Sequence, residues 1–320
     1  MQTQQLAVPP VQIRHEEAVK GTYDIISIML KYGGIYELSE GCYQGDQNRS
    51  YTEAQQLQQK HLLNLTGLKR GDHLFDIGCG HGVLLQEAKR QGIINKGITL
   101  SRKQFEDHRD LDTYLLNWRQ IPEKRPNWEN QFDAVCAIGS LEHFVSPREV
   151  ADNLKEKIYL SFFRVCRWLL KPGGRLVVTA IHYRPELVLC TKNAQNQYYK
   201  PWRWFSGQFH LGTLAWLGGS YYPIVDELPP IAESIGFSLD FQEDGTKDYF
   251  FTSEHWLNEL KNKMLKTSLL REILHEFKVY PFHTTYGLLC LLLFQSWNWQ
   301  FRGNGDDPPT KLLRYVWKKK

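Results

Sequence analysis

The first residues that could do chemistry lie in a short acidic and glycine-rich segment, "DIGCGHG". Asp76 stands two residues before Gly78, and Gly78, Gly80 and Gly82 occupy alternate positions between an apolar run and a helical pattern. A glycine turn between a strand and a helix lets a ligand approach the bare backbone. Dinucleotide-binding folds use the spacing G-x-G-x-x-G, and a pyrophosphate would repel an adjacent carboxylate. The acid suits a ligand with an ammonium group, such as the amino-acid end of S-adenosylmethionine (SAM), although a glycine turn can also simply close a tight connection.

Glu142 and His143 form a second polar pair, just after an apolar run at 132–140. In open α/β sheets the carboxyl ends of the strands carry the chemistry, so we expect both side chains near the glycine turn. A carboxylate there can accept a proton or orient a bound amine or anion. A helix N-cap is the plainer role for Glu142, but Asp, Asn and Ser are the usual caps.

The elements that must position these residues alternate between strands and helices. Strand patterns occur at 73–78, 96–101, 132–140 and 174–181, and helix patterns occur at 84–91 and 150–170. This βαβ rhythm predicts an α/β fold with a doubly wound, mostly parallel sheet.

The chain is long for one domain and short for two, at 320 residues. Aromatic residues between glycines and prolines interrupt the rhythm at 183–223, which suggests a lid over a pocket or a patch that contacts a membrane surface. The pocket side of such a lid would include some of Trp202, Trp204, Phe205, Trp216, Tyr221 and Tyr222. We therefore expect a flexible arm at 1–20, a helical cap at 21–70, a SAM-binding Rossmann-like core at 71–182, an aromatic lid insertion at 183–226, completion of the core sheet at 227–252 and a C-terminal helical region at 253–320.

The composition excludes several classes of protein. A net charge of +4 without a long basic stripe gives no reason to expect a nucleic-acid partner. The six cysteines show no CxxC spacing, so we expect no metal site. The first residues lack the apolar core of a signal peptide, and the longest apolar run, 287–294, is far shorter than the roughly 20 residues that span a bilayer. We expect a cytoplasmic protein with reduced thiols, and a peripheral membrane contact stays open.

Further motifs follow the glycine turn in a fixed order. They are "GITLSRKQ" at 97–104, "AIGSLEHF" at 137–144, "LLKPGGRLVV" at 169–178, "DYFFTSEHW" at 248–256 and "YGLLCLLLFQ" at 286–295. In this order and spacing the chain resembles the cyclopropane-fatty-acid synthase branch of the class I SAM-dependent methyltransferases. That branch also includes mycolic acid methyltransferases and some plant alkaloid N-methyltransferases. The resemblance implies a seven-stranded Rossmann-like sheet, with SAM as the cofactor.

The resemblance also assigns roles to particular residues. It implies that the cofactor is bound by Asp76, Gly78, Gly80, Thr99, Leu100, Gln104, Asn117 and Trp118. In the synthases a bicarbonate ion is thought to remove the proton that remains after methyl transfer to an alkene. The resemblance places Cys42, Glu142, Tyr286 and the backbone of Ile181 around that ion. An ordinary buried thiol and a packed aromatic ring are the plainer interpretations of Cys42 and Tyr286.

The acceptor is less well defined than the cofactor. The histidine of the bicarbonate set is replaced by Thr179, and His182, three residues later, would point to the opposite face of a strand, so bicarbonate binding is in doubt. In the N-methyltransferase relatives a pair like Glu142 and His143 is implicated in deprotonating an amine. We predict a SAM-dependent methyltransferase that transfers a methyl(ene) group to an unsaturated acyl or lipid-type acceptor. The catalytic candidates are Glu142, His143, Cys42 and Tyr286.

Three alternatives remain for the function. One is a C- or N-methyltransferase of a small specialised metabolite, with an amine or alkene as substrate and Glu142 and His143 as the base. Another is a SAM-binding protein without activity, which the intact acids and glycines disfavour. The last is an NAD-dependent oxidoreductase, which the glycine spacing disfavours.

Overall fold

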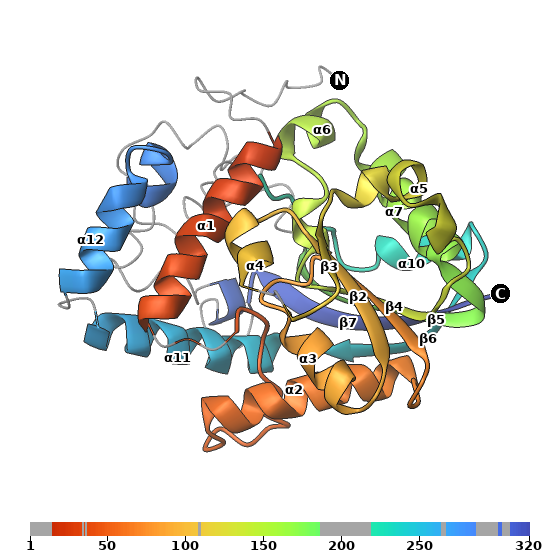
Figure 1. Ribbon diagram of the computed structural model, residues 1–320, viewed down its shortest axis with the longest axis horizontal. Helices are drawn as coiled ribbons and strands as arrows, with labels where there is room; N and C mark the ends of the chain where they lie inside the picture. Colours follow the sequence, from red (N-terminus) through yellow and green to blue (C-terminus); the bar gives the residue numbers. More distant parts are fainter. Residues whose placement is uncertain are drawn as a thin grey trace.

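The computed structural model describes residues 15–33, 35, 37–107, 110–185, 219–263, 267–285, 300–302 and 308–320. Within these residues, seven strands form one sheet in the order β3-β2-β1-β4-β5-β7-β6 (Figure 1). The strands are β1 His73–Ile77, β2 Ile94–Thr99, β3 Thr113–Leu115, β4 Phe132–Ile138, β5 Leu170–Tyr183, β6 Phe237–Asp244 and β7 Thr310–Lys319. The pairs among β1 to β5 are parallel, whereas β7 is antiparallel to both β5 and β6. The predicted doubly wound, mostly parallel, seven-stranded sheet is confirmed.

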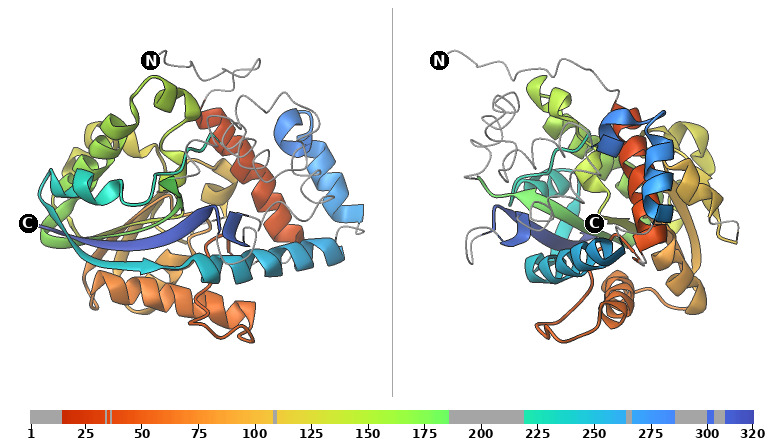
Figure 2. Two further views of the ribbon diagram at one scale, coloured as in Figure 1. Left: turned by 180° about the vertical axis from the view of Figure 1, so that it is seen from behind. Right: turned by 90° about the vertical axis from the view of Figure 1, so that its left-hand side faces the viewer.

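Helices cover both faces of this sheet. The first face packs against α2 (Tyr51–Thr66) and α3 (Val83–Arg90), through an apolar cluster that includes Leu62, Leu85 and Val177. The second face packs against α7 (Lys155–Leu169) and α10 (Leu228–Glu233), through a larger cluster rich in aromatic rings. Figure 2 shows α2 and α10 on opposite sides of the sheet. The central strands are therefore buried on both faces, as parallel strands of this kind usually are.

A helical cap lies beside the carboxyl ends of the strands. It consists of α1 (His15–Gly33), α11 (Thr246–Lys263) and α12 (Thr267–Glu276), and α1 packs against the other two (Figures 1 and 2). The remaining helices are short: α4 Arg102–Glu106, α5 Ile121–Lys124, α6 Pro147–Ala151, and the 3₁₀ turns η1 Trp118–Gln120, η2 Pro126–Trp128 and η3 Leu141–His143. The connections after β2, β3 and β4 carry α4, η1 and η3, so these turns lie at the same end of the sheet as the glycine turn after β1.

Three predicted boundaries are wrong. The arm at 1–20 ends too late, because α1 begins at His15 and carries Glu16 and Glu17 in its first turn, where the helix dipole favours acids. The helix predicted at 150–170 is two helices, because Asn153 adopts a left-handed φ of +58° between α6 and α7. The region at 253–320 is not helical throughout, because its last residues form β7.

The lid prediction falls mainly on residues 186–218, which lie outside the described residues, as do Trp202, Trp204, Phe205 and Trp216. The described end of this region returns to β5. The Tyr183 amide donates a hydrogen bond to the Pro223 carbonyl at 2.8 Å, and the Val225 amide donates to the Tyr183 carbonyl at 3.0 Å. These contacts leave Tyr221 and Tyr222 buried.

Candidate functional site

The glycine turn joins β1 to α3 with its backbone in conformations that favour glycine. Gly78, Gly80 and Gly82 have φ values of +83°, +52° and +71°. A Cβ atom on Gly78 would lie 2.6 Å from Cβ of Ser140, so no side chain fits there. Among the described residues, a Cβ on Gly80 would meet only one atom within 4 Å, the Oε1 atom of Glu37 at 4.0 Å. The turn therefore presents bare backbone to open space at Gly80.

Asp76 occupies the end of β1 with an unsatisfied carboxylate. The side chain is 3% exposed, and its Oδ1 atom has no hydrogen-bond partner among the described residues. Burial, with a smaller contribution from the Glu37 carboxylate, raises the pKa of Asp76 to about 7. A buried carboxylate oxygen without a partner is costly, and a cationic ligand would relieve that cost.

A cavity of about 710 Å³ opens over this turn. Its lining brings together most of the residues that the sequence singled out: Asp76, Gly78, Gly80, Thr99, Leu100, Gln104, Asn117, Trp118, Glu142 and His143. Cys42 does not line it, and Tyr286 lies outside the described residues. A volume of this size accommodates a ligand as large as SAM.

The end of β2 supplies a second polar group. Thr99 donates a hydrogen bond from Oγ1 to Oε1 of Gln104 at 2.8 Å. Within the residues that the structure describes, the buried Nε2 atom of Gln104 has no partner. Ser101 caps α4 by accepting from the Gln104 amide, and its hydroxyl donates to Asp24 of α1 at 3.0 Å. Gln104 is therefore held in place with a free N–H donor for an oxygen of a ligand.

Asn117 and Trp118 follow β3 and have structural partners as well. Asn117 caps η1 by accepting from the Arg119 amide at 3.0 Å, and its Nδ2 atom donates to Glu16 at 2.5 Å. Trp118 is buried and packs edge-on against Phe162, with ring centroids 5.8 Å apart. Both residues contribute to the cavity wall, and Asn117 also ties that wall to α1.

Glu142 lies in η3, just after β4. Its Oε1 atom accepts a hydrogen bond from the Ile181 amide at 2.7 Å, whereas its buried Oε2 atom has no partner in the described part of the chain. Burial raises the pKa of Glu142 to about 8. The free oxygen belongs to a residue that lines the same cavity as the glycine turn.

His143 is engaged on both ring nitrogens. Its Nε2 atom lies 2.8 Å from the Tyr23 hydroxyl, and its Nδ1 atom lies 2.7 Å from Oγ of Ser220. These contacts link η3 to α1 and to the segment that follows residue 218. His143 therefore connects parts of the cavity wall.

Of the residues that the family resemblance places around bicarbonate, Glu142 and Ile181 line the cavity and contact each other, and Tyr286 lies outside the described residues. The Ile181 amide donates to Glu142, and Oγ1 of Thr179 accepts from the Gly139 amide at 3.1 Å. Neither Thr179 nor Cys42 lines the cavity. Burial raises the pKa of the Cys42 thiol to about 11, so it is a neutral group. His182 contacts the Ala180 carbonyl at 2.8 Å, and burial lowers its pKa to about 4.

No signal in the sequence indicated Glu37, which lines the cavity. Tyr222 and Tyr249 line it as well, and the sequence places the first in the predicted lid and the second in the motif at 248–256. Tyr23 of α1 also lines the cavity. Glu37 belongs to none of the sequence motifs, so its sequence context does not distinguish it from an acid on the protein surface.

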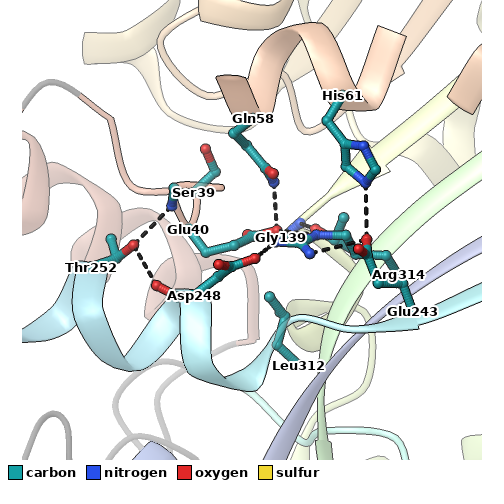
Figure 3. A network of polar contacts seen from close by, with 12 residues as sticks. Ser39, Glu40, Gln58, His61, Gly139, Glu243, Asp248, Thr252, Leu312 and Arg314 are labelled. Atoms are coloured by element: carbon teal, nitrogen blue, oxygen red, sulfur yellow. Dashed lines mark hydrogen bonds and ion pairs between the residues drawn. The ribbon is translucent and has the colours of Figure 1, made fainter. Parts of the chain in front are cut away.

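A buried ionic network lies next to the cavity (Figure 3). Arg314 of β7 is fully buried and pairs with Glu40 at 3.0 Å, Glu243 at 3.1 Å and Asp248 at 3.0 Å. His61 of α2 contacts Glu243 at 2.9 Å. The network joins α2, β6, β7 and α11 to the segment that contains Glu40, a residue of the cavity wall.

The comparisons with known proteins identify the family. The family model for mycolic acid cyclopropane synthetase matches residues 12–300. The chain belongs to this family. The predicted branch of SAM-dependent methyltransferases is therefore confirmed.

The individual relatives match a shorter part of the chain than the family model does. A probable fatty acid methyltransferase of Pseudomonas putida is 28% identical over 152 residues, which is 42% of this chain and 37% of the relative. Cyclopropane mycolic acid synthase 2 of Mycobacterium leprae is 29% identical over 188 residues, which is 54% of this chain and 56% of the relative. The chain thus spans about half or less of the length of these curated relatives.

Solved structures support the fold over nearly the whole chain. The cyclopropane synthase MmaA2 from Mycobacterium tuberculosis aligns with a TM-score of 0.68 and 20% identity, and covers 96% of this chain and 99% of its own. The mycolic acid cyclopropane synthase CmaA1, in complex with SAH and CTAB, aligns with a TM-score of 0.67 and 19% identity, and likewise covers 96% of this chain and 99% of its own. The class I methyltransferase fold is confirmed.

In the described part of the chain, none of the helices is both long and apolar enough to cross a bilayer. No group of three or more His, Cys, Asp or Glu side chains there could hold a metal ion.

Proposed function

We propose that this chain transfers a methyl or methylene group from SAM to an unsaturated acyl chain of a lipid-type acceptor. The observation that carries the proposal concerns the buried Oε2 atom of Glu142, which has no partner among the described residues and lies on the wall of the cavity that also contains the glycine turn. The family and the names of the relatives support the acyl acceptor. We further propose that the protein works in the cytoplasm and meets this acceptor at the membrane surface.

The cofactor site fits SAM on three points. The free Oδ1 atom of Asp76 is suited to an ammonium group, the bare backbone at Gly80 permits close approach, and the free Nε2 atom of Gln104 is suited to an oxygen. Bound SAM would supply a methyl group on a positively charged sulfur. The role of the chain is then to hold this group in line with the acceptor and to exclude water, since proximity and alignment are the main needs of a displacement reaction.

Glu142 would act as the proton acceptor. Methyl transfer to an alkene would break the C–S bond of the transferred methyl group as a new C–C bond forms, with a neutral sulfide as the leaving group and a carbocation left on the acyl chain. Loss of a proton from the transferred methyl group would close a ring, and loss of a proton from a neighbouring chain carbon would give a methyl-branched alkene. The Oε2 atom of Glu142 can take that proton once the carboxyl is ionised. The hydrogen bond from the Ile181 amide to Oε1 fixes the other end of the carboxylate at 2.7 Å.

Two observations on the described residues support proton removal without bicarbonate. Glu142 itself takes up the Ile181 amide, and Thr179 and Cys42 lie away from the cavity wall. We therefore derive no step through this ion and assign proton removal to Glu142 directly. The same arrangement could deprotonate an amine, which keeps a small-molecule methyltransferase as the second candidate, with His143 positioned beside the base.

The test combines methyl-labelled SAM with unsaturated phospholipid vesicles and, separately, with small amines, each with and without added bicarbonate. The proposal expects label in the lipid at a rate that does not depend on bicarbonate. Label only in the amines would favour the second candidate. A rate that requires bicarbonate would contradict the role of Glu142 as direct base.

A further inference from the structure

Glu37 places a second carboxylate beside the glycine turn. Its Oε1 atom lies 4.0 Å from the point that a Cβ atom on Gly80 would occupy, and the residue lines the same cavity as Asp76. The negative charge of Glu37 contributes to the raised pKa of Asp76, so the two carboxylates are close enough to repel each other. Both groups therefore face the part of the cavity above the bare backbone at Gly80.

The position of Glu37 is fixed by its surroundings. The Tyr51 hydroxyl donates to the Glu37 carbonyl at 2.8 Å and accepts from the Glu37 amide at 3.2 Å. The indole N–H of Trp256 donates to the same hydroxyl at 3.1 Å. The Leu38 amide donates to Oε1 of Glu37 at 2.6 Å, which orients the carboxylate. A side chain held in this way is prepared for a ligand rather than free to turn to solvent.

Within the described residues, the cations of the cavity wall pair with other acids. Lys20 lies 4.0 Å from Glu16, and Arg119 lies 3.1 Å from Glu149, which also contacts His15 at 3.7 Å. The two carboxylates at the turn thus have no such pairing in the described part of the protein. Burial raises the pKa of Glu37 to about 7, against the effect of its backbone hydrogen bonds. Both acids would ionise more readily next to a cation.

We propose that Glu37 is a second anionic partner for the α-ammonium group of the cofactor, so that Asp76 and Glu37 together hold this group at the glycine turn. The inference rests on SAM being the cofactor, as proposed above. It predicts that recognition at this position depends on the ammonium group of the ligand and not on its adenosine.

Three ligands separate this role from a structural one. SAM carries the ammonium and the carboxylate, decarboxylated SAM carries only the ammonium, and 5′-methylthioadenosine carries neither. Glu37→Gln removes the charge but keeps an oxygen to accept from the Leu38 amide. Glu17→Gln serves as the control, because Glu17 is an exposed acid among the residues that line the same cavity.

Calorimetric titration of the full chain should show a selective loss. We expect Glu37→Gln to bind SAM and decarboxylated SAM about 10-fold to 100-fold more weakly, the range for a hydrogen bond to a charged group. Its affinity for 5′-methylthioadenosine should equal that of the wild type, and Glu17→Gln should match the wild type for all three ligands.

Two results would overturn the inference. An equal loss for 5′-methylthioadenosine would mean that Glu37 only supports the shape of the turn, and an unchanged affinity for SAM would mean that it does not contact the ammonium group. A wild-type chain that binds none of the three ligands would instead overturn the proposed cofactor, and this inference with it.

Discussion

Replacement of Glu142 by glutamine should make the protein less sensitive to alkaline pH while it removes activity. The side chain is 2% exposed, its Oε2 atom has no partner in the described ranges of the chain, and the amide of glutamine has nearly the same shape as the carboxyl group. Glutamine can still accept from the Ile181 amide through Oε1 and resembles the protonated carboxyl. The substitution therefore isolates the cost of a buried charge.

The magnitude follows from the change in pKa. Burial raises the pKa of Glu142 from 4.5 to about 8, which corresponds to about 5 kcal/mol at about 1.4 kcal/mol for each pH unit. The folded state binds this proton more tightly than the unfolded chain does. The associated stability is therefore present below pH 4.5 and is lost as the pH rises through 8. Between pH 5 and pH 9 the loss is about 4 kcal/mol, or about 6 °C in melting temperature for a chain of this length.

Thermal unfolding at pH 5 and pH 9 measures this effect. The melting temperature of the wild type should fall between the two values, and in Glu142→Gln the fall should be smaller by about 6 °C. Glu233→Gln, which changes an exposed acid at the end of α10, should behave as the wild type does. An equal fall in melting temperature in Glu142→Gln and the wild type would refute the claim that ionisation of this buried carboxyl group destabilises the folded protein.

The remaining predictions concern turnover, cofactor binding and the ionic network. Turnover of the wild type should decline as the pH falls below about 8, because the base must be ionised. Glu142→Gln should lower turnover roughly 10²–10⁴-fold. An equal loss of turnover in His143→Ala would instead indicate that Glu142 and His143 act together as the base. Asp76→Asn and Gly80→Val should both weaken SAM binding in calorimetry while circular dichroism shows an intact fold; wild-type affinity in both would refute the site. Arg314→Met should lower the free energy of unfolding in urea by about 3–5 kcal/mol, because it leaves buried carboxylates without a cation, and a loss below about 1 kcal/mol would mean that the network is hydrated.

Much of the fold could be predicted because its elements carry strong local patterns. The strands before Gly78 and Glu142 are apolar runs bounded by turn residues, and the helix after the glycine turn has a regular apolar face. The strand β7 could not be predicted in the same way. Its residues are buried on both faces between β5 and β6, so the alternation that distinguishes a strand is missing.

The same distinction between regular and irregular segments applies to the residues of the candidate site. Residues that follow strands, such as Asp76 and Glu142, could be placed from sequence, because the carboxyl ends of parallel strands meet at one edge. Cys42 and Glu37 lie in an irregular segment whose path depends on distant partners. The Cys42 amide donates to the Ala54 carbonyl, and the Tyr51 hydroxyl holds Glu37. Their distances from the cavity could therefore be known only from the folded structure.

Transfer of label from methyl-labelled SAM into unsaturated phospholipid, in parallel with SAM affinity, tests the central claim most directly. The account predicts that the wild type labels the lipid and that Glu142→Gln binds SAM with wild-type affinity but transfers label roughly 10²-fold or more slowly. Rapid labelling by Glu142→Gln, or no lipid labelling by a wild-type protein that binds SAM, would contradict it.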